Sequence, residues 1–199
     1  MREQVADRLA ELGVYAAPDV LDGCLTYLAL LTRWNRRMNL TALPLEEPVP
    51  QSSLDKLIVE PLLAAGLVPE TCPSWIDLGS GGGSPAVPLR LVHRQGFARL
   101  VEAKERKCAF LREAVRSLDL GHTRVDSIRF EALTVEFPVD LITIRAVRLD
   151  AALLHQISSW LRPGGTLMCF GGEAADQLFK PVSENALPDG SLLRTYRRA

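Results

Sequence analysis

The chain has 199 residues, of which 47% are hydrophobic and only 6% aromatic, a length that suits one core with at most a small accessory unit. Its 23 Lys and Arg residues nearly balance its 24 Asp and Glu residues, so no global positive field draws it to nucleic acid or to a membrane surface. Any site for a polyanion must therefore be a local patch.

Four cysteines lie far apart, without a CxxC pair or a histidine at zinc spacing, and they predict reduced thiols and no metal site. They are Cys24, Cys72, Cys108 and Cys169. The N-terminal residues alternate charge with apolar residues at helical spacing, so we expect neither a signal peptide nor an anchor, and no stretch reaches transmembrane length. These features predict a cytoplasmic protein, and we expect a monomer.

From residue 2 to about 66 the sequence predicts helices, because apolar residues recur every three or four positions. The pattern covers residues 5–12 and 21–34, and Asp19 is the expected cap of the second helix. A proline-rich loop at 42–50 precedes a third helix over about 53–65, which Gly66 closes. We predict a helical N-terminal extension over residues 1–66.

After residue 73 the hydrophobic pattern changes to short apolar runs separated by predicted helices of ten to fifteen residues, which is typical of βαβ units. Strands are predicted at 75–78, 99–103, 123–128, 139–144 and 166–170, and helices near 85–94, 104–119 and 149–161. The tail predicts two strands joined at Pro188-Asp189-Gly190. This α/β pattern over 73–199 predicts a Rossmann-like, mostly parallel seven-stranded sheet with an antiparallel last strand. Its ligand should lie at the carboxyl ends of the strands.

The segment WIDLGSGGGSP at 75–85 places four glycines directly after the first of these strands. A P-loop is excluded, because Gly83 is followed by Ser84-Pro85 instead of Lys and Ser or Thr. A dinucleotide fold is weakened, because Ser84 occupies the position of its third glycine. The pattern Asp-x-Gly-x-Gly-x-Gly, from Asp77 through Gly79 and Gly81 to Gly83, matches S-adenosylmethionine-dependent methyltransferases best. A tight turn without a ligand is the structural alternative.

Two acids support a cofactor without phosphate. S-adenosylmethionine carries an ammonium group, which the carboxylate of Asp77 can attract. Glu102 lies at the end of the next strand, where it can accept hydrogen bonds from ribose hydroxyls. Nicotinamide dehydrogenases share this pair and remain an alternative. The backbone at Phe130 and Glu131 is a candidate for the adenine edge, or else a plain surface loop. Arg145 ends a strand buried on both faces, so its charge must be functional or paired.

Several short motifs occur together along the chain in one order. They are W-N-x-x-x-N-L-T at 34–41, L-D at 54–55, D-x-G-S-G-x-G-x-P at 77–85, V-P-L at 87–89, V-E-x-x-x-x-K at 101–107, F-L at 110–111 and R-A-V at 145–147. Over residues 5 to about 198 the chain resembles the family of glucose-inhibited division protein B, the small-subunit ribosomal RNA guanine-N7 methyltransferases G.

This resemblance implies a class I methyltransferase fold and methyl transfer from S-adenosylmethionine to N7 of a guanine in 16S ribosomal RNA, free or in a small-subunit assembly particle. Together with the glycine motif, it implies a set of cofactor-binding residues around the loop and the strand ends. These are Asp77, Gly79, Ser80, Gly81, Gly83, Ser84, Glu102, Phe130, Glu131 and Arg145.

The chain departs from the family pattern around its L-D, glycine-loop and last-strand motifs. The family usually has His, Ser, Phe-Pro-Gly and Lys-Gly where this chain has Ser52, Lys56, Ser84-Pro85-Ala86 and Phe170-Gly171. These departures bear on RNA engagement and on the exact target. The alternatives are a methyltransferase of the same fold with another substrate, and an RNA-binding module with a vestigial cofactor pocket.

If guanine N7 is the acceptor, its lone pair is free and no general base is needed, so we expect no catalytic dyad, with Arg145 as the one candidate. His93, His122 and His155 are expected to be satisfied or exposed. Candidate RNA-binding residues are Arg33, Arg36, Arg37 and Arg148, with Arg194, Arg197 and Arg198 in the tail; a solvated face is the alternative. For Trp34 and Asn35 we expect a core role.

Overall fold

The computed structural model describes residues 1–199 and begins with a helical third. It comprises α1 (Arg2–Glu11), α2 (Pro18–Asn35), α3 (Gln51–Leu54), the π-helical turn η1 (Asp55–Val59) and α4 (Glu60–Ala65), of which the last three run on as one helical segment. The predicted extension is therefore helical, but the expected cap at Asp19 is wrong. Helix α2 starts at Pro18, whose fixed φ suits the first helical position, and no side chain caps it.

The rest of the chain forms one seven-stranded sheet in the order β3-β2-β1-β4-β5-β7-β6. Its strands are β1 (Ser74–Leu78), β2 (Phe97–Glu102), β3 (Thr123–Ser127), β4 (Val139–Arg145), β5 (Leu161–Phe170), β6 (Phe179–Ala186) and β7 (Leu192–Arg198). Strands β1 to β5 pair in parallel, and β7 is antiparallel to both β5 and β6. This confirms the predicted Rossmann-like class I fold.

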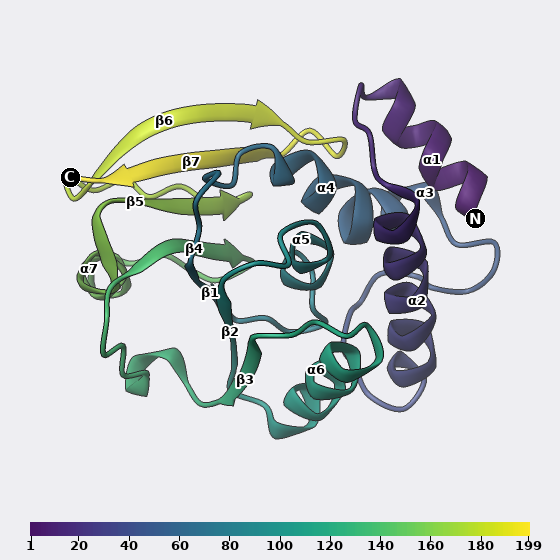
Figure 1. Ribbon diagram of the computed structural model, residues 1–199, viewed down its shortest axis with the longest axis horizontal. Helices are drawn as coiled ribbons and strands as arrows, with labels where there is room; N and C mark the ends of the chain where they lie inside the picture. The colour runs from purple at the N-terminus through teal and green to yellow at the C-terminus, as the bar shows by residue number, and fades with distance from the viewer.

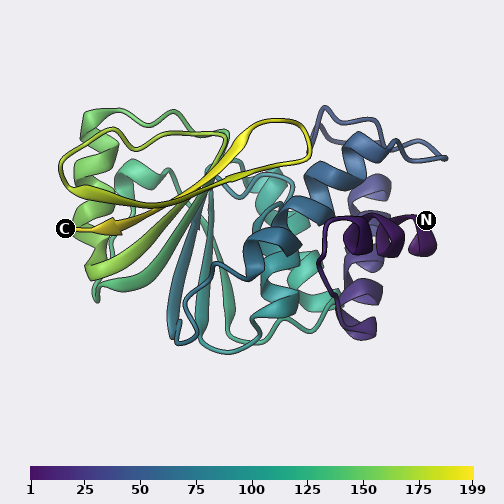
Figure 2. The same ribbon diagram turned by 90° about the horizontal axis from the view of Figure 1, so that it is seen from above.

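Helices lie on both faces of the sheet (Figures 1 and 2). On one face α5 (Ala86–Val92) and α6 (Glu105–Ser117) pack beside the N-terminal helices, and on the other lies α7 (Ala151–Trp160). The connection from β3 to β4 contains only the single turn η2 (Phe130–Ala132). Strand β5 begins at Leu161, five residues before its predicted start, because Leu161 pairs with Val139 directly after α7 ends.

Successive side chains along each strand point to opposite faces of the sheet, so the apolar interior forms two clusters, one on each face. Trp75 belongs to a cluster of 37 buried residues that runs from the N-terminal helices to the sheet, whereas Ile76 belongs to one of 17 residues under α7. The division into an extension (1–66) and a core (73–199) stays a prediction. No helix of the protein combines the length and apolar character that a membrane span requires.

Candidate functional site

The glycine-rich loop lies where β1 ends, at the carboxyl edge of the sheet (Figure 1). Gly79 and Gly83 have φ of +71° and +90°, in the left-handed region that favours glycine. A Cβ atom on Gly79 would lie 2.8 Å from Cγ2 of Val147, and one on Gly83 would lie 3.2 Å from the ring of Tyr27. The loop therefore leaves no room for side chains at these two points.

Hydrogen bonds hold this loop to two other elements. The amides of Gly79 and Ser80 donate to the carbonyl of Val101 in β2 at 2.9 and 3.0 Å. From the other side, the hydroxyl of Tyr27 in α2 donates to the carbonyl of Gly82 at 2.7 Å. The loop is thus fixed between the sheet and the N-terminal extension.

Asp77, at the end of β1, has one satisfied and one free carboxylate oxygen. Its Oδ1 accepts a 2.5 Å hydrogen bond from the hydroxyl of Thr143, which itself accepts from Nε1 of Trp75 at 2.9 Å. Its Oδ2 is buried without a hydrogen-bond partner. Burial raises the pKa of Asp77 to about 6, although the hydrogen bond from Thr143 opposes the shift. The free oxygen can accept from a cationic ligand group.

Glu102, at the end of β2, joins the glycine loop to the second strand. Its Oε2 accepts from the amide of Gly81 at 3.0 Å, and its Oε1 accepts from the amide of Lys104 at 2.8 Å. The fold therefore brings the second acid of the sequence pattern against the loop. After β3 the amide of Ile128 donates to the carbonyl of Glu102, so the backbone that leads to Phe130 also starts beside this carboxylate.

Phe130 and Glu131 form the η2 turn on this same edge. Phe130 is half-buried against the cluster under α7, while Glu131 is exposed and its carbonyl accepts from the side chain of Gln156. Their assignment to the adenine stays a prediction.

Arg145 is paired, as a charge at the end of a buried strand requires. Its Nη1 donates to the carbonyl of Lys56 at 2.5 Å and reaches Oγ of Ser84 at 3.5 Å. Its Nη2 lies 2.9 Å from Oε2 of Glu60, and its Cζ lies 4.4 Å from the ring centroid of Phe170. Ser84, the last residue of the loop before Pro85, thus lies beside the arginine.

Glu60 is a buried charge that the sequence analysis missed. A signal was present, because Glu60 is a lone acid in the apolar run LIVEPLLAA, and a charge in such a run must find a partner. Three positions that depart from the family pattern contact Arg145 or Glu60, namely Lys56, Ser84 and Phe170. Ser52 is exposed elsewhere, and Ala86 is buried at the start of α5.

The candidate RNA-binding arginines divide into two groups. Arg36, Arg37 and Arg148 are exposed, and Arg33 is exposed with Nη2 3.9 Å from Glu113. In the tail, the side chains are engaged within the protein: Arg194 pairs with Glu184, Arg197 donates to Thr166 and Gly164, and Arg198 donates to the carbonyl of Leu161. The first group therefore offers the freer cations.

The motif that begins at Trp34 has the core role expected of it. The ring of Trp34 meets that of Phe110 edge-on with centroids 6.0 Å apart, and Oδ1 of Asn35 accepts from the amides of Leu40 and Thr41. The histidines also behave as expected: Nε2 of His93 is 2.9 Å from the carbonyl of Ala65, and His122 and His155 are exposed.

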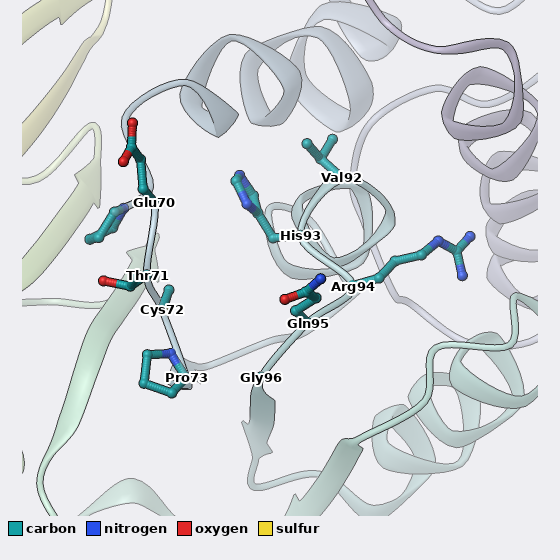
Figure 3. A pocket seen from close by; sticks show the side chains of 10 residues that line it. Glu70, Thr71, Cys72, Pro73, Val92, His93, Arg94, Gln95 and Gly96 are labelled. Atoms are coloured by element: carbon teal, nitrogen blue, oxygen red, sulfur yellow. The ribbon is translucent and has the colours of Figure 1, made fainter.

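A separate hollow of about 690 Å³ lies at the opposite edge of the sheet (Figure 3). Residues 69–73, which precede β1, and 92–96, which precede β2, line it. In Figure 3 Glu70 and Pro73 stand on one side and Val92 and His93 on the other. It contains none of the predicted cofactor-binding residues.

Solved structures share this fold at low sequence identity. A putative O-methyltransferase from Klebsiella pneumoniae aligns over 98% of this chain and 96% of its own, with a TM-score of 0.62 and 14% identity. A SAM dependent methyltransferase from Aquifex aeolicus aligns over 75% of this chain and 94% of its own, with a TM-score of 0.58 and 14% identity.

Sequence relatives are much closer. A ribosomal RNA small subunit methyltransferase G from Xanthomonas axonopodis pv. citri is 40% identical over 79% of this chain and 69% of its own length. One from Stenotrophomonas maltophilia is 40% identical over 82% of this chain and 74% of its own. The GidB family, described as rRNA small subunit methyltransferase G, matches residues 22–187. This chain belongs to the GidB family of rRNA small subunit methyltransferases G.

Proposed function

We propose that this protein transfers a methyl group from S-adenosylmethionine to N7 of a guanine in 16S ribosomal RNA. The observation that carries the proposal is the arrangement at the carboxyl edge of the sheet, where a glycine loop that leaves no room for side chains at Gly79 and Gly83 lies beside the carboxylates of Asp77 and Glu102. Family membership supports ribosomal RNA as the acceptor.

The residues around the glycine loop suit the chemical groups of the cofactor. The unpartnered Oδ2 of Asp77 suits an ammonium group, the carboxylate of Glu102 suits ribose hydroxyls, and the backbone at Phe130 and Glu131 suits an adenine edge. When bound, S-adenosylmethionine supplies an electrophilic methyl group on a sulfonium. The chemical types of these groups therefore support S-adenosylmethionine as the cofactor.

The chain needs only to bind and orient the two reactants. Guanine N7 has a free lone pair and loses no proton before it attacks, so no residue has to act as a general base. The contribution of the protein is alignment of the acceptor nitrogen with the methyl carbon, together with the electrostatic environment that Asp77, Glu102 and Arg145 provide.

The RNA side of the proposal rests on three exposed arginines, Arg36, Arg37 and Arg148. Contacts from such side chains to phosphates supply most of the affinity for nucleic acid in a chain whose net charge is only −1. Because N7 lies in the deep groove of an RNA helix, the acceptor is expected in a loop or in an incompletely folded assembly particle.

Calorimetry with S-adenosylmethionine, followed by methyl transfer to deproteinised 16S RNA and to intact small subunits, tests the proposal. We expect cofactor binding and a methylated guanine that mass mapping locates at N7. Cofactor binding without transfer to either RNA would indicate a methyltransferase with another substrate. RNA affinity without any cofactor heat would indicate an RNA-binding module.

A further inference from the structure

The helical segment from Gln51 to Ala65 carries an irregularity that frees one backbone carbonyl. In the π-helical turn the amide of Glu60 donates to the carbonyl of Asp55, five residues back. The carbonyl of Lys56 would then need the amide of residue 61, but Pro61 has none. Lys56 is therefore left with a carbonyl that no helical amide satisfies.

This free carbonyl is one wall of a socket for the guanidinium of Arg145. The guanidinium socket consists of the Lys56 carbonyl, the Glu60 carboxylate, Oγ of Ser84 and the ring of Phe170. The hydroxyl of Ser84 also donates to the Lys56 carbonyl at 3.3 Å. Two walls thus come from the N-terminal extension, and the others come from the glycine loop and β5.

Glu60 supplies the charge of the socket. Its side chain is fully buried, and each of its oxygens faces a different cation: Nζ of Lys56 lies 3.2 Å from Oε1, and Nη2 of Arg145 lies 2.9 Å from Oε2. Burial raises the pKa of Glu60, and the positive charges of Arg145 and Lys56 oppose this shift. A buried carboxylate with two cationic partners favours the ionised form that can hold an arginine.

The socket lies between the end of β4 and the end of the glycine loop. Arg145 is the last residue of β4, whose neighbour in the sheet is β1, and Ser84 ends the loop that follows β1. Nη2 of the arginine forms an ion pair with Oε2 of Glu60 without a well-aligned hydrogen bond, and Nε has no hydrogen-bond partner. Nε is therefore the donor of the guanidinium that the socket does not use.

We propose that Glu60 is a positioning residue for cofactor binding: it orients Arg145 against the end of the glycine loop from the N-terminal extension. The inference rests on the proposed function, since the ligand of the glycine loop is taken to be S-adenosylmethionine. In this arrangement the extension completes the cofactor site through the Glu60 carboxylate and the Lys56 carbonyl.

The first test is Glu60→Gln, which keeps the shape of the side chain and removes its charge. We expect the dissociation constant for S-adenosylmethionine, measured by calorimetry, to rise about tenfold, a change of about 1.4 kcal/mol. The Michaelis constant for the cofactor should rise in parallel while kcat changes less than about threefold, because the missing interaction orients bound cofactor and contributes equally in the transition state.

Asp55→Asn is the matched control. Asp55 is a buried acid in the same helical segment, but it binds Arg8 of α1 and does not touch Arg145. Its substitution also removes a paired carboxylate and is expected to lower thermal stability, while cofactor affinity stays within about twofold of the wild type. An equal loss of affinity in both variants would overturn the inference, because it would mark a general effect of weakening the segment.

A double-mutant cycle with Arg145→Gln separates positioning from folding. If Glu60 acts through Arg145, adding Glu60→Gln to Arg145→Gln should weaken cofactor binding no further, so the two effects will not multiply. Because the double variant buries no unpaired charge, it should also regain thermal stability that a single variant loses, without regaining affinity. The comparison of the double variant with Arg145→Gln remains informative even where Glu60→Gln alone folds poorly.

The outcomes that would overturn the inference are distinct from those that concern the function. Wild-type affinity in Glu60→Gln, or losses that multiply in the double variant, would show that Glu60 does not position Arg145 for the cofactor. Wild-type protein that gives no heat with S-adenosylmethionine would instead remove the proposed function.

Discussion

At the scale of the residue, the site depends on buried carboxylates whose surroundings differ. Glu102 uses both oxygens on backbone amides, whereas Asp77 uses one oxygen on Thr143 and keeps the other free. The sequence pattern predicted both acids. It could not predict Thr143 and Trp75 as the residues that orient Asp77, because they come from neighbouring positions on two strands that pair only in the folded sheet.

Asp77 should make cofactor affinity depend on pH. With its pKa raised to about 6, the carboxyl is neutral below that pH and charged above it, and only the charged form attracts an ammonium group. We expect S-adenosylmethionine to bind about tenfold more weakly at pH 5 than at pH 7.

Calorimetry at both pH values checks this. Asp77→Asn is expected to bind S-adenosylmethionine weakly at each pH, with no difference in affinity between the two. Asp140→Asn is the control, since Asp140 is a buried acid bonded to Ser74 and Arg162 at the other end of β4. If Asp77→Asn kept the wild-type change in cofactor affinity between pH 5 and pH 7, the pH dependence would belong to another group.

Arg90 is buried and extensively hydrogen-bonded, which its sequence context does not indicate. In the run VPLRLV it resembles a surface cation near a helix end, yet it is only 1% exposed. Its guanidinium donates to the carbonyls of His93, Arg94, Gln95 and Gly121 and to the hydroxyl of Thr123. It thereby joins the end of α5 to the start of β3.

Arg90→Met should lower the free energy of unfolding by about 3 kcal/mol, because several buried acceptors lose their donor. Urea unfolding measures this loss. Arg94→Met is the control, because Arg94 is exposed and makes one 3.3 Å bond to the carbonyl of Asp119, and it should change stability by less than about 0.5 kcal/mol. Equal effects of the two substitutions would contradict this role for Arg90.

At the scale of the element, α2 supports the glycine loop. The sequence predicts α2 from its apolar spacing and the loop from its glycines, but it does not reveal that the two touch. Tyr27 is fully buried, its ring lies where a side chain on Gly83 would stand, and its hydroxyl holds the carbonyl of Gly82. The helix therefore sets the position of a loop that begins 52 residues after Tyr27.

Tyr27→Phe removes only that hydroxyl and should weaken both the fold and the site. Because the Gly82 carbonyl loses its partner, we expect the free energy of unfolding to fall by about 1 kcal/mol. The dissociation constant for S-adenosylmethionine should increase roughly fivefold. Urea unfolding and calorimetry measure the two effects. Tyr15→Phe, at a residue that is 85% exposed, should change neither, and a similar loss there would argue against the contact.

At the scale of the whole molecule, the hairpin of β6 and β7 meets the N-terminal extension beside the guanidinium socket. Nζ of Lys56 lies 2.6 Å from Oδ2 of Asp189, in the turn between β6 and β7, which Figures 1 and 2 show reaching toward the helical segment. Hydrogen bonds from Lys56 and Ser191 lower the pKa of Asp189. Lys56 thus ties the C-terminal hairpin to the extension.

The coupling between Lys56 and Asp189 should depend on pH in a defined direction. Because the folded pKa of Asp189 is below its ordinary value of 3.8, the ion pair stabilises the fold above that pH and is lost as the pH falls below it. A double-mutant cycle of Lys56→Met and Asp189→Asn should give no more than about 1 kcal/mol at pH 7, because both side chains are partly exposed.

Urea unfolding at a series of pH values from 7 to 3 provides the measurement. The coupling energy should shrink at the acid end, and a value that grew with acidity would contradict the ion pair. The same cycle built on Lys56→Met and Glu184→Gln, an acid on β6 that pairs with Arg194, should show no coupling.

The exposed arginines can be tested separately from the cofactor site. Arg36→Gln with Arg37→Gln should weaken 16S RNA binding at low salt and reduce the slope of log affinity against log salt by about 1 for each phosphate that is no longer neutralised. Filter binding across a salt series measures this, and cofactor affinity should be unchanged. Arg116→Gln, an exposed arginine paired with Glu113, serves as the control and should keep the wild-type slope.

The sequence by itself determined the helical extension, the order of strands and helices, the glycine loop and its two acids. These follow from periodicity, turn residues and motif spacing, which are properties of short stretches of chain. Only the tertiary structure decided that Glu60 and the Lys56 carbonyl hold Arg145, that Tyr27 holds the loop and that Lys56 reaches Asp189. Lys56 and Arg145 are 89 positions apart and Lys56 and Asp189 are 133 apart, so their contacts depend on how the extension packs against the sheet, which no local pattern encodes.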